Sequence, residues 1–313
     1  MPKRRFIAIR AAGTILAATA VAMAQTHATP DVKTGYAPVN GLKMYYEIHG
    51  AGQPLILLHG GLGSTEMLEE IITPLAKGRQ VIAVDLQGHG RTADIDRPLR
   101  CESMADDIAG LMKYLGIAKA DLMGYSLGGC VALRTAIQHA DLVRKVVLVS
   151  TAFKRDGWYP EGVAAMAHLD ARAAEAMKPS PIYQTYARIA PRPADWPVLV
   201  TKTGDLLRQE YDWSQEVAAI RAPTMLVYGD ADAIRPEHMV QFYELLGGGK
   251  KKGCGLGRIG DVAGAPGHPA GTDALQHLFR SRAGLYGDTV SGSAVAGGEM
   301  RRADLGTRST GYS

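Results

Sequence analysis

One hexapeptide constrains the fold of this chain more than any other stretch: Gly-Tyr-Ser-Leu-Gly-Gly at residues 124–129. It lies between an apolar run of strand length, 120–125, and a segment with helical spacing, 126–139. The pattern G-x-S-x-G in that setting predicts a sharp strand-to-helix turn, with glycines where side chains would clash. Amides at the start of the following helix then point at developing negative charge. The alternative is a glycine-rich turn without chemistry, but the flanking elements favour Ser126 as a nucleophile.

The rest of the chain alternates strand-like and helix-like segments from about residue 35. Continuous apolar runs of this length are typical of parallel strands buried on both faces. The pattern predicts an α/β fold with a mostly parallel central sheet flanked by helices. We expect strands at 42–49, 54–59, 80–85, 120–125, 143–150 and 224–229, and helices at 64–75, 101–115, 126–139 and 236–246.

The segment from about 153 to 221 interrupts this alternation. It contains no convincing strand and is rich in Ala, Met, Pro and aromatic residues. An insertion of this kind between two core strands predicts a helical cap over a pocket. We expect most of its aromatic side chains to fill the core of the cap and one or two to contact a ligand.

Composition excludes several classes of protein. With 313 residues, 46% hydrophobic and 21% charged, the chain is globular and forms one large or two small domains. The net charge of +4 comes from the first 24 residues, and from Gln25 onward 31 basic residues balance 31 acidic ones. Nothing indicates binding to nucleic acid or to an anionic membrane. No metal-ligand spacing or nucleotide-binding glycine loop follows a strand, so we expect no metal and no cofactor.

Residues 1–24 have the features of a signal peptide. A basic stretch precedes a short apolar run that ends in Ala22-Met23-Ala24, a small-x-small cleavage pattern. A transmembrane anchor is the alternative, but the run is shorter than the about 20 residues that span a bilayer. We therefore expect Sec export to the periplasm or the medium, without a stable membrane anchor after cleavage. In such an oxidising compartment Cys101 and Cys130 could pair, which the sequence does not decide.

Two further loops carry groups that suit acyl chemistry. His59-Gly60-Gly61-Leu62-Gly63 follows a strand, and its turn can supply the Gly61 N–H to an oxyanion, with the Leu127 N–H as the second donor. Downstream, Gly229-Asp230-Ala231-Asp232 follows another strand and places a carboxylate on a loop. The order of serine before aspartate is that of the α/β-hydrolase triad.

Over residues 35–249 the chain resembles the α/β-hydrolase superfamily, in its small esterase and haloperoxidase-like branch. The landmarks are His59-Gly60-Gly61, the loop of residues 85–90 (Asp-Leu-Gln-Gly-His-Gly), the serine turn and the Gly-Asp-Ala-Asp loop. The resemblance implies Asp232 rather than Asp230 as the acid and acyl transfer through an acyl-enzyme. A serine at position 126 argues against the dehalogenases and epoxide hydrolases of the family, which use aspartate there.

The triad histidine is where the sequence departs from the family. It should lie on a loop after the last strand, and His59, His89, His139 and His238 all lie too early and are expected to be structural. His268 and His277 lie far enough downstream, but no apolar strand precedes either of them. His268 is the candidate base of the chain as written, and we expect it to be inactive.

The residues after about 250 also lack the periodicity of a last strand and helix. Residues 251–313 therefore look like a non-family tail, and we expect it to be disordered. The codons permitted for residues 253–292, read from the second base of each, allow DAGWDGSG, then ARLAILPGPTHYNIF, then APALASTVTPFLD. These strings supply an apolar strand, a P-G-x-x-H loop and an amphipathic helix in the expected order. We therefore hypothesise a frameshift near Lys250-Lys251-Lys252, where an adenine run promotes slippage.

These features predict an exported serine hydrolase that acts on a small carboxylic ester or related acyl compound, and that is incomplete as written. Its expected partner is a small acyl substrate, and the sequence leaves the oligomeric state open. Two alternatives remain: a catalytically silent hydrolase fold that binds a ligand under its cap, and a haloperoxidase-like or C–C bond hydrolase with the same triad. Loss of the last strand and helix should also expose apolar surface and lower solubility.

Overall fold

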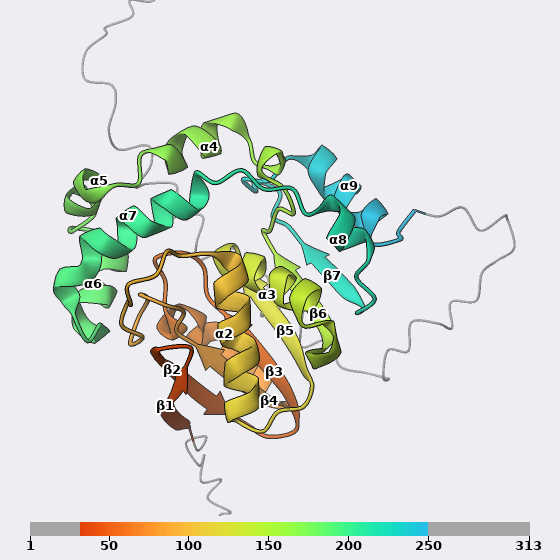
Figure 1. Ribbon diagram of the computed structural model, residues 1–313, viewed down its shortest axis with the longest axis horizontal. Coiled ribbons are helices and arrows are strands. Elements are labelled where there is room, and N and C mark those ends of the chain that lie inside the picture. Colours follow the sequence, from red (N-terminus) through yellow and green to blue (C-terminus); the bar gives the residue numbers. More distant parts are fainter. Residues whose placement is uncertain (1–31, 250–313) are drawn as a thin grey trace, which may run out of the picture. The chain divides into compact units, whose positions relative to one another are not determined.

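The computed structural model describes residues 32–249, which form a seven-stranded sheet flanked by helices (Figure 1). The strand order is β1-β2-β4-β3-β5-β6-β7. The five strands from β3 to β7 run parallel, whereas β1 and β2 form an antiparallel hairpin that joins β4. The strands are β1 (Lys33–Val39), β2 (Leu42–His49), β3 (Gln53–Leu58), β4 (Arg79–Val84), β5 (Ala120–Tyr125), β6 (Val143–Val149) and β7 (Thr224–Val227). The predicted α/β class with a mostly parallel sheet is confirmed.

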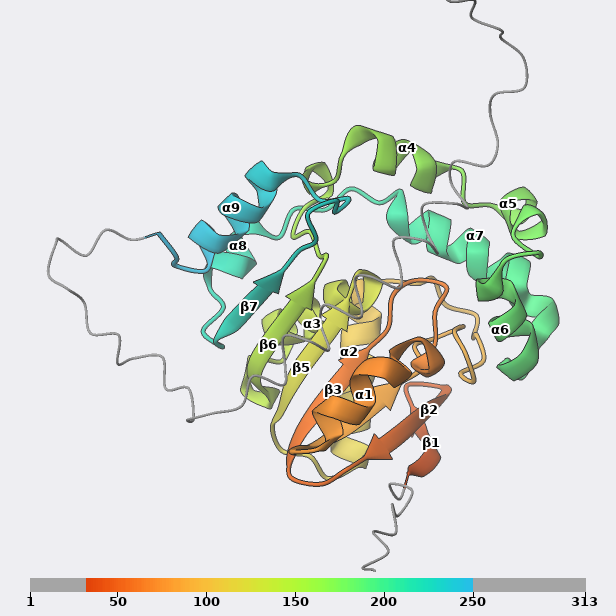
Figure 2. The same cartoon turned by 180° about the vertical axis from the view of Figure 1, so that it is seen from behind.

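The helices divide between the two faces of the sheet and the cap. Helices α2 and α3 lie in front of the strands in Figure 1, and Figure 2 shows α1 on the opposite face, in front of β3 and β4. The core helices are α1 (Glu69–Ala76), α2 (Cys101–Tyr114), α3 (Leu127–Gln138) and α9 (Pro236–Leu245). Short 3-10 helices are η1 (Thr65–Leu68), η2 (Ala140–Leu142), η3 (Arg155–Gly157) and η4 (Pro193–Asp195).

The segment between β6 and β7 forms the helical cap that the sequence predicts. Its helices are α4 (Pro160–Ala167), α5 (Ala171–Ala176), α6 (Pro181–Ile189), α7 (Trp196–Leu207) and α8 (Ser214–Ala218). Trp196 is 1% exposed and packs its ring 5.5 Å from that of Tyr183 and 5.2 Å from that of Tyr186. These aromatic residues therefore fill the core of the cap, as expected.

Two elements differ from the sequence-based expectation. The strand β1 was not predicted, because Lys33–Val39 mixes polar residues with Gly35 and Pro38 and has no continuous apolar run. It forms because Asn40 and Gly41, with φ of 47° and 86°, make a tight hairpin turn to β2. The helix expected at 64–75 is divided into η1 and α1.

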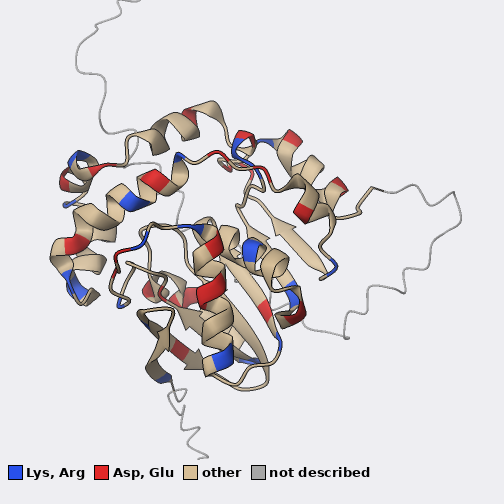
Figure 3. Ribbon diagram, viewed as in Figure 1, with Lys and Arg blue, Asp and Glu red and all other residues tan. Residues whose placement is uncertain are grey.

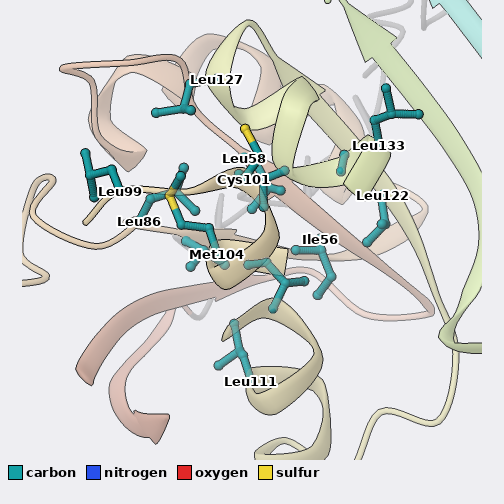
Figure 4. Close-up of a cluster of buried hydrophobic side chains, with 14 of the residues drawn as sticks. Ile56, Leu58, Leu86, Leu99, Cys101, Met104, Leu111, Leu122, Leu127 and Leu133 are labelled. Carbon is teal, nitrogen blue, oxygen red and sulfur yellow. The ribbon is translucent and has the colours of Figure 1, made fainter. Parts of the chain in front are cut away.

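The larger apolar core lies between the sheet and helices α2 and α3. Figure 4 shows its central side chains, which come from β3, β5, the loop after β4 and both helices. Removing such side chains from water is the main favourable term in folding, about 1.5–3 kcal/mol for each large residue. The labelled members, all at most 7% exposed, are Ile56, Leu58, Leu86, Leu99, Cys101, Met104, Leu111, Leu122, Leu127 and Leu133.

A disulfide joins the two helices of this core. Cys101, the first residue of α2, is bonded to Cys130 in the first turn of α3, with 6.0 Å between their Cα atoms. The pairing that the sequence left undecided is therefore present. Closing a loop with a sequence separation of 29 stabilises a fold by about 3–4 kcal/mol in the chain-entropy description.

The second face of the sheet is covered unevenly. Met123, Val147 and Met225 are register partners on β5, β6 and β7, and they point to the same face as α1. Exposure increases along this row, from 6% at Met123 to 56% at Met225. In Figure 2 no helix of the described part lies in front of β6 and β7. Within residues 32–249, the β7 side of this face therefore has no covering helix.

The described helices carry charged residues of both signs. Figure 3 shows acidic and basic residues interspersed along the helices, while the central strands carry few of either. Within residues 32–249, no helix is long and apolar enough to cross a membrane. The predicted signal peptide and the predicted out-of-frame tail lie outside the described residues.

Candidate active site

Ser126 lies at the tip of the turn between β5 and α3. Its backbone has φ of 52° and ψ of −114°, a conformation that is strained for any residue with a side chain. The Ser126 N–H donates to Val149 O at 2.9 Å, and the Ser126 carbonyl accepts from the Cys130 N–H at 2.9 Å. The serine is half-buried. These bonds to β6 and α3 hold the strained turn and present the hydroxyl at the carboxyl edge of the sheet.

Three glycines allow this turn to pack against its surroundings. A Cβ at Gly124 would lie 2.1 Å from Gly128 O, and a Cβ at Gly128 would lie 2.5 Å from His59 O. A Cβ at Gly129 would lie 1.8 Å from Thr151 Oγ1. At Gly124 and Gly128 these contacts are with backbone atoms, so the close approach requires glycine at both positions. At Gly129 a side chain would require Thr151 to move.

The loop after β3 lies against the serine turn. A Cβ at Gly60 would lie 3.6 Å from Ser126 Cβ, and a Cβ at Gly61 would lie 3.9 Å from Leu127 Cβ. Leu127 is the first residue of α3, where helical amides have no acceptor within the helix. The two residues predicted as oxyanion donors, Gly61 and Leu127, are therefore neighbours on either side of the site.

Asp232 lies on the loop after β7 and is held by three donors. Its Oδ2 accepts from Ser150 Oγ at 2.6 Å and from the Gly229 N–H at 3.2 Å, and its Oδ1 accepts from the Ile234 N–H at 3.1 Å. Asp232 is half-buried, whereas Asp230 is exposed. Of the two aspartates, Asp232 is the one whose carboxylate these donors hold. Its role as the acid stays a prediction.

Ser150 is a residue of this site that the sequence analysis missed. It follows β6 with φ of 51°, and its N–H donates to Val227 O at 2.9 Å. The preceding residue, Val149, accepts the Ser126 N–H. One short segment after β6 thus contacts both the serine turn and Asp232. No motif marks such a residue, because its contacts come from β7 and the loop after it, far along the chain.

Comparison with known proteins identifies the family. A family model described as alpha/beta hydrolase fold matches residues 53–179. The superfamily protein YisY of Bacillus subtilis is 30% identical over 219 residues, which are 62% of this chain and 79% of that protein. The pimeloyl-acyl-carrier-protein methyl ester esterase of Neisseria meningitidis is 31% identical over 261 residues, 77% of this chain and 94% of that protein. The chain belongs to the α/β-hydrolase fold family.

Solved structures agree with this assignment. An esterase from Thermogutta terrifontis aligns with a TM-score of 0.56 and 26% identity, over 68% of this chain and 86% of that one. This α/β-hydrolase chain therefore has relatives among both sequences and structures that are named esterases, and it is a hydrolase by family.

Four described histidines of this α/β-hydrolase chain, His59, His89, His139 and His238, have side-chain partners other than Ser126 and Asp232. His59 donates from Nδ1 to Gly60 O at 2.7 Å and accepts the Leu86 N–H at Nε2, 3.1 Å away. His139 pairs with Asp106 at the surface. These two side chains therefore brace loops and helices, as the sequence analysis expected.

Two buried histidines have neutral rings. Burial lowers the pKa of His89 to about 4, and its Nδ1 lies 2.8 Å from Gln87 O. Burial also lowers the pKa of His238 to about 4, and its ring stacks on that of Phe153 while its Nε2 accepts the Phe153 N–H. Neither ring is placed as a base for Ser126. The candidates His268 and His277 lie outside the described residues.

Asp85 joins the two loops in front of the sheet. Its carboxylate accepts the Thr65 N–H and the Arg91 N–H, each at 2.7 Å, and it is fully buried. Burial raises the pKa of Asp85 to about 6. This residue of the Asp-Leu-Gln-Gly-His-Gly landmark therefore fixes loop geometry and lies apart from the serine turn. No group of three or more His, Cys, Asp or Glu in residues 32–249 could hold a metal ion.

Proposed function

We propose that this α/β-hydrolase chain derives from a serine hydrolase that cleaves a small carboxylic ester through an acyl-enzyme. The observation that carries the proposal is the strained Ser126 at the start of α3, held beside Gly61 and Leu127 by glycines that tolerate no side chain. The chain belongs to the α/β-hydrolase family, and two proteins similar to it are named esterases. A serine at this position favours acyl transfer over the chemistry of family members that use aspartate.

The proposed reaction assigns one role to each group. Ser126 Oγ forms a bond to the carbonyl carbon of the ester while a base removes its proton, and the carbonyl π electrons move to the oxygen. The Gly61 and Leu127 amides stabilise that oxyanion. The alcohol leaves with the proton, and water then releases the acid from Ser126 by the same steps. Asp232 orients the base and stabilises its charged form.

The general base that removes the Ser126 proton needs a separate assignment. We propose that it is the histidine of the Pro-Gly-Pro-Thr-His string, encoded in the shifted reading frame of residues 253–292. The open edge of β7 supports this proposal, because Met225 is 56% exposed on a parallel strand of the kind that is buried on both faces. The apolar string ARLAIL in the same frame is a strand that can pair with that edge, and the following helix can cover the face.

The chain with the sequence given, called the written chain below, is therefore proposed to be a hydrolase that has lost its base. Without a base, the oxyanion hole and binding alone leave a small residual rate, and turnover falls by about three orders of magnitude or more. A silent fold that holds a ligand under its cap is the second candidate, favoured by the absence of a suitably placed histidine among residues 32–249. A ligand that raises the melting temperature without being turned over would favour this second candidate.

Export is proposed as well. The signal-like residues 1–24 and the Cys101–Cys130 disulfide both fit an oxidising compartment. Expression with subcellular fractionation tests this. We expect a periplasmic product whose N-terminal residue, by mass spectrometry, is Gln25. An uncleaved chain in the cytoplasm contradicts export.

Two steps test the function. The gene is first resequenced across the codons for residues 247–255. Hydrolysis of p-nitrophenyl acetate and butyrate is then compared between the written chain and a version with one base removed in the codons for Lys250 to Lys252. We expect at least about a thousandfold higher turnover in the repaired chain. Equal turnover in both chains overturns the assignment of the base, and no turnover in either overturns the esterase proposal.

A further inference from the structure

The chain enters the cap through residues 153–159, called the cap neck below. The cap neck pairs with the segment that returns from α7 to the core. The Trp213 N–H donates to Phe153 O at 3.0 Å, and Lys154 forms an antiparallel bridge with Asp212. The two segments that connect the cap to the core are therefore bonded to each other.

The cap neck also pairs with residues 228–235, the loop between β7 and α9 that carries Asp232 and is called the acid loop below. Trp158 forms an antiparallel bridge with Ile234. Ile234 is 1% exposed, and its N–H donates to Asp232 Oδ1 at 3.1 Å. A single buried residue therefore contacts both the cap neck and the carboxylate of the proposed acid.

His238, in the first turn of α9, packs against this junction. It is 2% exposed, and its ring stacks on that of Phe153 with 4.1 Å between the ring centroids. A Cβ at Gly157 would lie 2.6 Å from three atoms of the His238 ring, so the ring touches the backbone of the cap neck. The same glycine accepts the Arg235 N–H at its carbonyl oxygen, 2.9 Å away. The ring is therefore packed where the cap neck meets the acid loop.

The hydrogen bond of His238 fixes where its ring can take up a proton. Its Nε2 accepts the Phe153 N–H at 3.2 Å. A neutral imidazole that accepts at Nε2 carries its proton on Nδ1. A second proton can therefore bind only at Nε2, where it would meet the Phe153 N–H. Protonation of the ring thus removes this hydrogen bond and places two donors against each other.

Charged groups from three segments act on the His238 ring. Burial is the largest influence and lowers its pKa from 6.5 to about 4. Asp156 of the cap neck and Asp212 of the returning segment raise the pKa, whereas Lys154 of the cap neck and Arg235 of the acid loop lower it. A ring that leaves this contact regains its ordinary pKa, so opening of the junction is coupled to proton uptake.

We propose that His238 is a positioning residue for Asp232: its neutral ring holds the cap neck against the acid loop, and its protonation releases the two from each other. The inference rests on the proposed function, in which Asp232 is the acid. It makes mild acid a signal that detaches the acid loop from the cap while the core of the protein stays folded.

Amide hydrogen exchange in the written chain tests the proposal without turnover. Exchange at Phe153, at Ile234 and at Leu133, a fully buried residue of α3, is measured by NMR at pH 7 and pH 5 and divided by the intrinsic rate at each pH. A pKa that changes from about 4 to 6.5 on opening makes opening about twentyfold more favourable at pH 5 than at pH 7. We expect this increase at Phe153 and Ile234, and both should exchange at least about tenfold faster than Leu133.

Two variants and a control assign the effect to one ring. His238→Gln keeps an acceptor but does not titrate, so it should preserve slow exchange at pH 7 and remove the increase at pH 5. His238→Leu has no acceptor and should speed exchange at Phe153 about fivefold at pH 7, the contribution of one hydrogen bond. His89→Gln is the matched control, because His89 is also buried with a pKa of about 4 but bonds to Gln87 O, so the increase at pH 5 should remain.

Three results would overturn the proposal. Exchange at Phe153 and Ile234 that is no faster than at Leu133 would mean that the junction opens only when the whole protein unfolds. No increase at pH 5 would mean that opening takes up no proton. An increase that persists in His238→Gln would assign the titration to another group. Because no substrate is present, failure of the esterase proposal leaves these measurements unchanged.

Discussion

The surroundings of Ser126, called the serine side, and those of Asp232, called the acid side, are packed to very different extents. Around Ser126, strand β5 is buried along both faces up to its last residue, three glycines accept no side chain, and α3 is fixed to α2 by a disulfide. Around Asp232, strand β7 is the last strand of the sheet that residues 32–249 form, and Met225 is 56% exposed. The serine side is complete within residues 32–249, whereas the acid side has a carboxylate in place and an open sheet beside it. This contrast agrees with the proposal that the segment following β7 is read out of frame.

The largest expected effect is on the serine side. In the frame-repaired chain, Ser126→Ala should lower kcat for p-nitrophenyl acetate by about four to six orders of magnitude, because the nucleophile is lost. In the written chain the same change should have almost no effect, since this chain is proposed to have no base. A large loss in the written chain would show that its serine side already works alone.

Packing on the serine side gives the next effect. Gly129→Ala should destabilise the protein by about 1–3 kcal/mol, because the new Cβ would lie 1.8 Å from Thr151 Oγ1 and the Thr151 side chain would have to move. Gly162→Ala, in α4, meets nothing within 4 Å and should be neutral or slightly stabilising. Urea unfolding compares the two variants. Similar midpoints would mean that the serine turn is less tightly packed than described.

Acid should destabilise both sides through buried histidines. The pKa of His89, and likewise of His238, is lowered by burial from 6.5 to about 4. Between pH 4 and 6.5 the unfolded chain binds more protons than the folded chain, so the free energy of unfolding falls as the pH is lowered. Each histidine accounts for about 3 kcal/mol of free energy of unfolding, which is fully present above pH 6.5 and is lost as the pH falls to 4. Asp85 acts in the opposite direction, because burial raises its pKa to about 6 and its charged form is disfavoured.

Urea unfolding at pH 7, 5.5 and 4 tests the sign. We expect the free energy of unfolding to fall on acidification in the unmodified chain. His89→Gln on the serine side and His238→Gln on the acid side should each reduce that fall. A free energy that rises toward pH 4 would contradict neutral burial of the two rings.

The open face of the acid side predicts a smaller effect that depends on the reading frame. Met225→Ser should change the stability of the written chain by less than about 0.5 kcal/mol, as at an exposed site. In the repaired chain it should cost about 1.5–3 kcal/mol, because the restored segment buries this side chain. Thermal melts of the four proteins measure the difference. Equal effects in both frames would mean that nothing in the restored segment covers β7.

Orientation of the acid predicts the smallest effect. In the repaired chain, Ser150→Ala should lower kcat about three- to tenfold without changing KM, because Asp232 loses one hydrogen bond. Ser150→Gly should give the same loss while relieving the strained φ. Ser214→Ala is the matched control, since Ser214 also donates to an aspartate, Asp212, but in an exposed part of the cap. An unchanged kcat in both Ser150 variants would make this residue purely structural.

The sequence predicted the parts of the fold that are buried on both faces. Strands β3 to β6 and helices α2 and α3 lie within a residue or two of their expected bounds, because continuous apolar runs allow little choice. The hairpin strand β1 was missed, since its residues alternate weakly and depend on β2 for pairing. The sequence allowed the Cys101–Cys130 disulfide but did not predict it, because the pairing depends on the packing of α2 against α3.

The site divides in the same way. The turn at Ser126 is encoded locally by its glycines, so a motif can find it. The strained Ser150 arises where β6 meets β7 and the Asp232 loop, and no local pattern encodes such contacts. The nucleophile and the acid remain predictions that chemistry must test, and the base depends on residues outside the described part.

Covalent labelling tests the central claim most directly. The written and the frame-repaired chains are treated with a fluorophosphonate, and the labelled peptide is identified by mass spectrometry. We expect rapid labelling of Ser126 in the repaired chain and labelling at least about a thousandfold slower in the written one, because the phosphonylation of serine needs the same base. Equally rapid labelling of Ser126 in the written chain, or none in the repaired chain, would contradict the account.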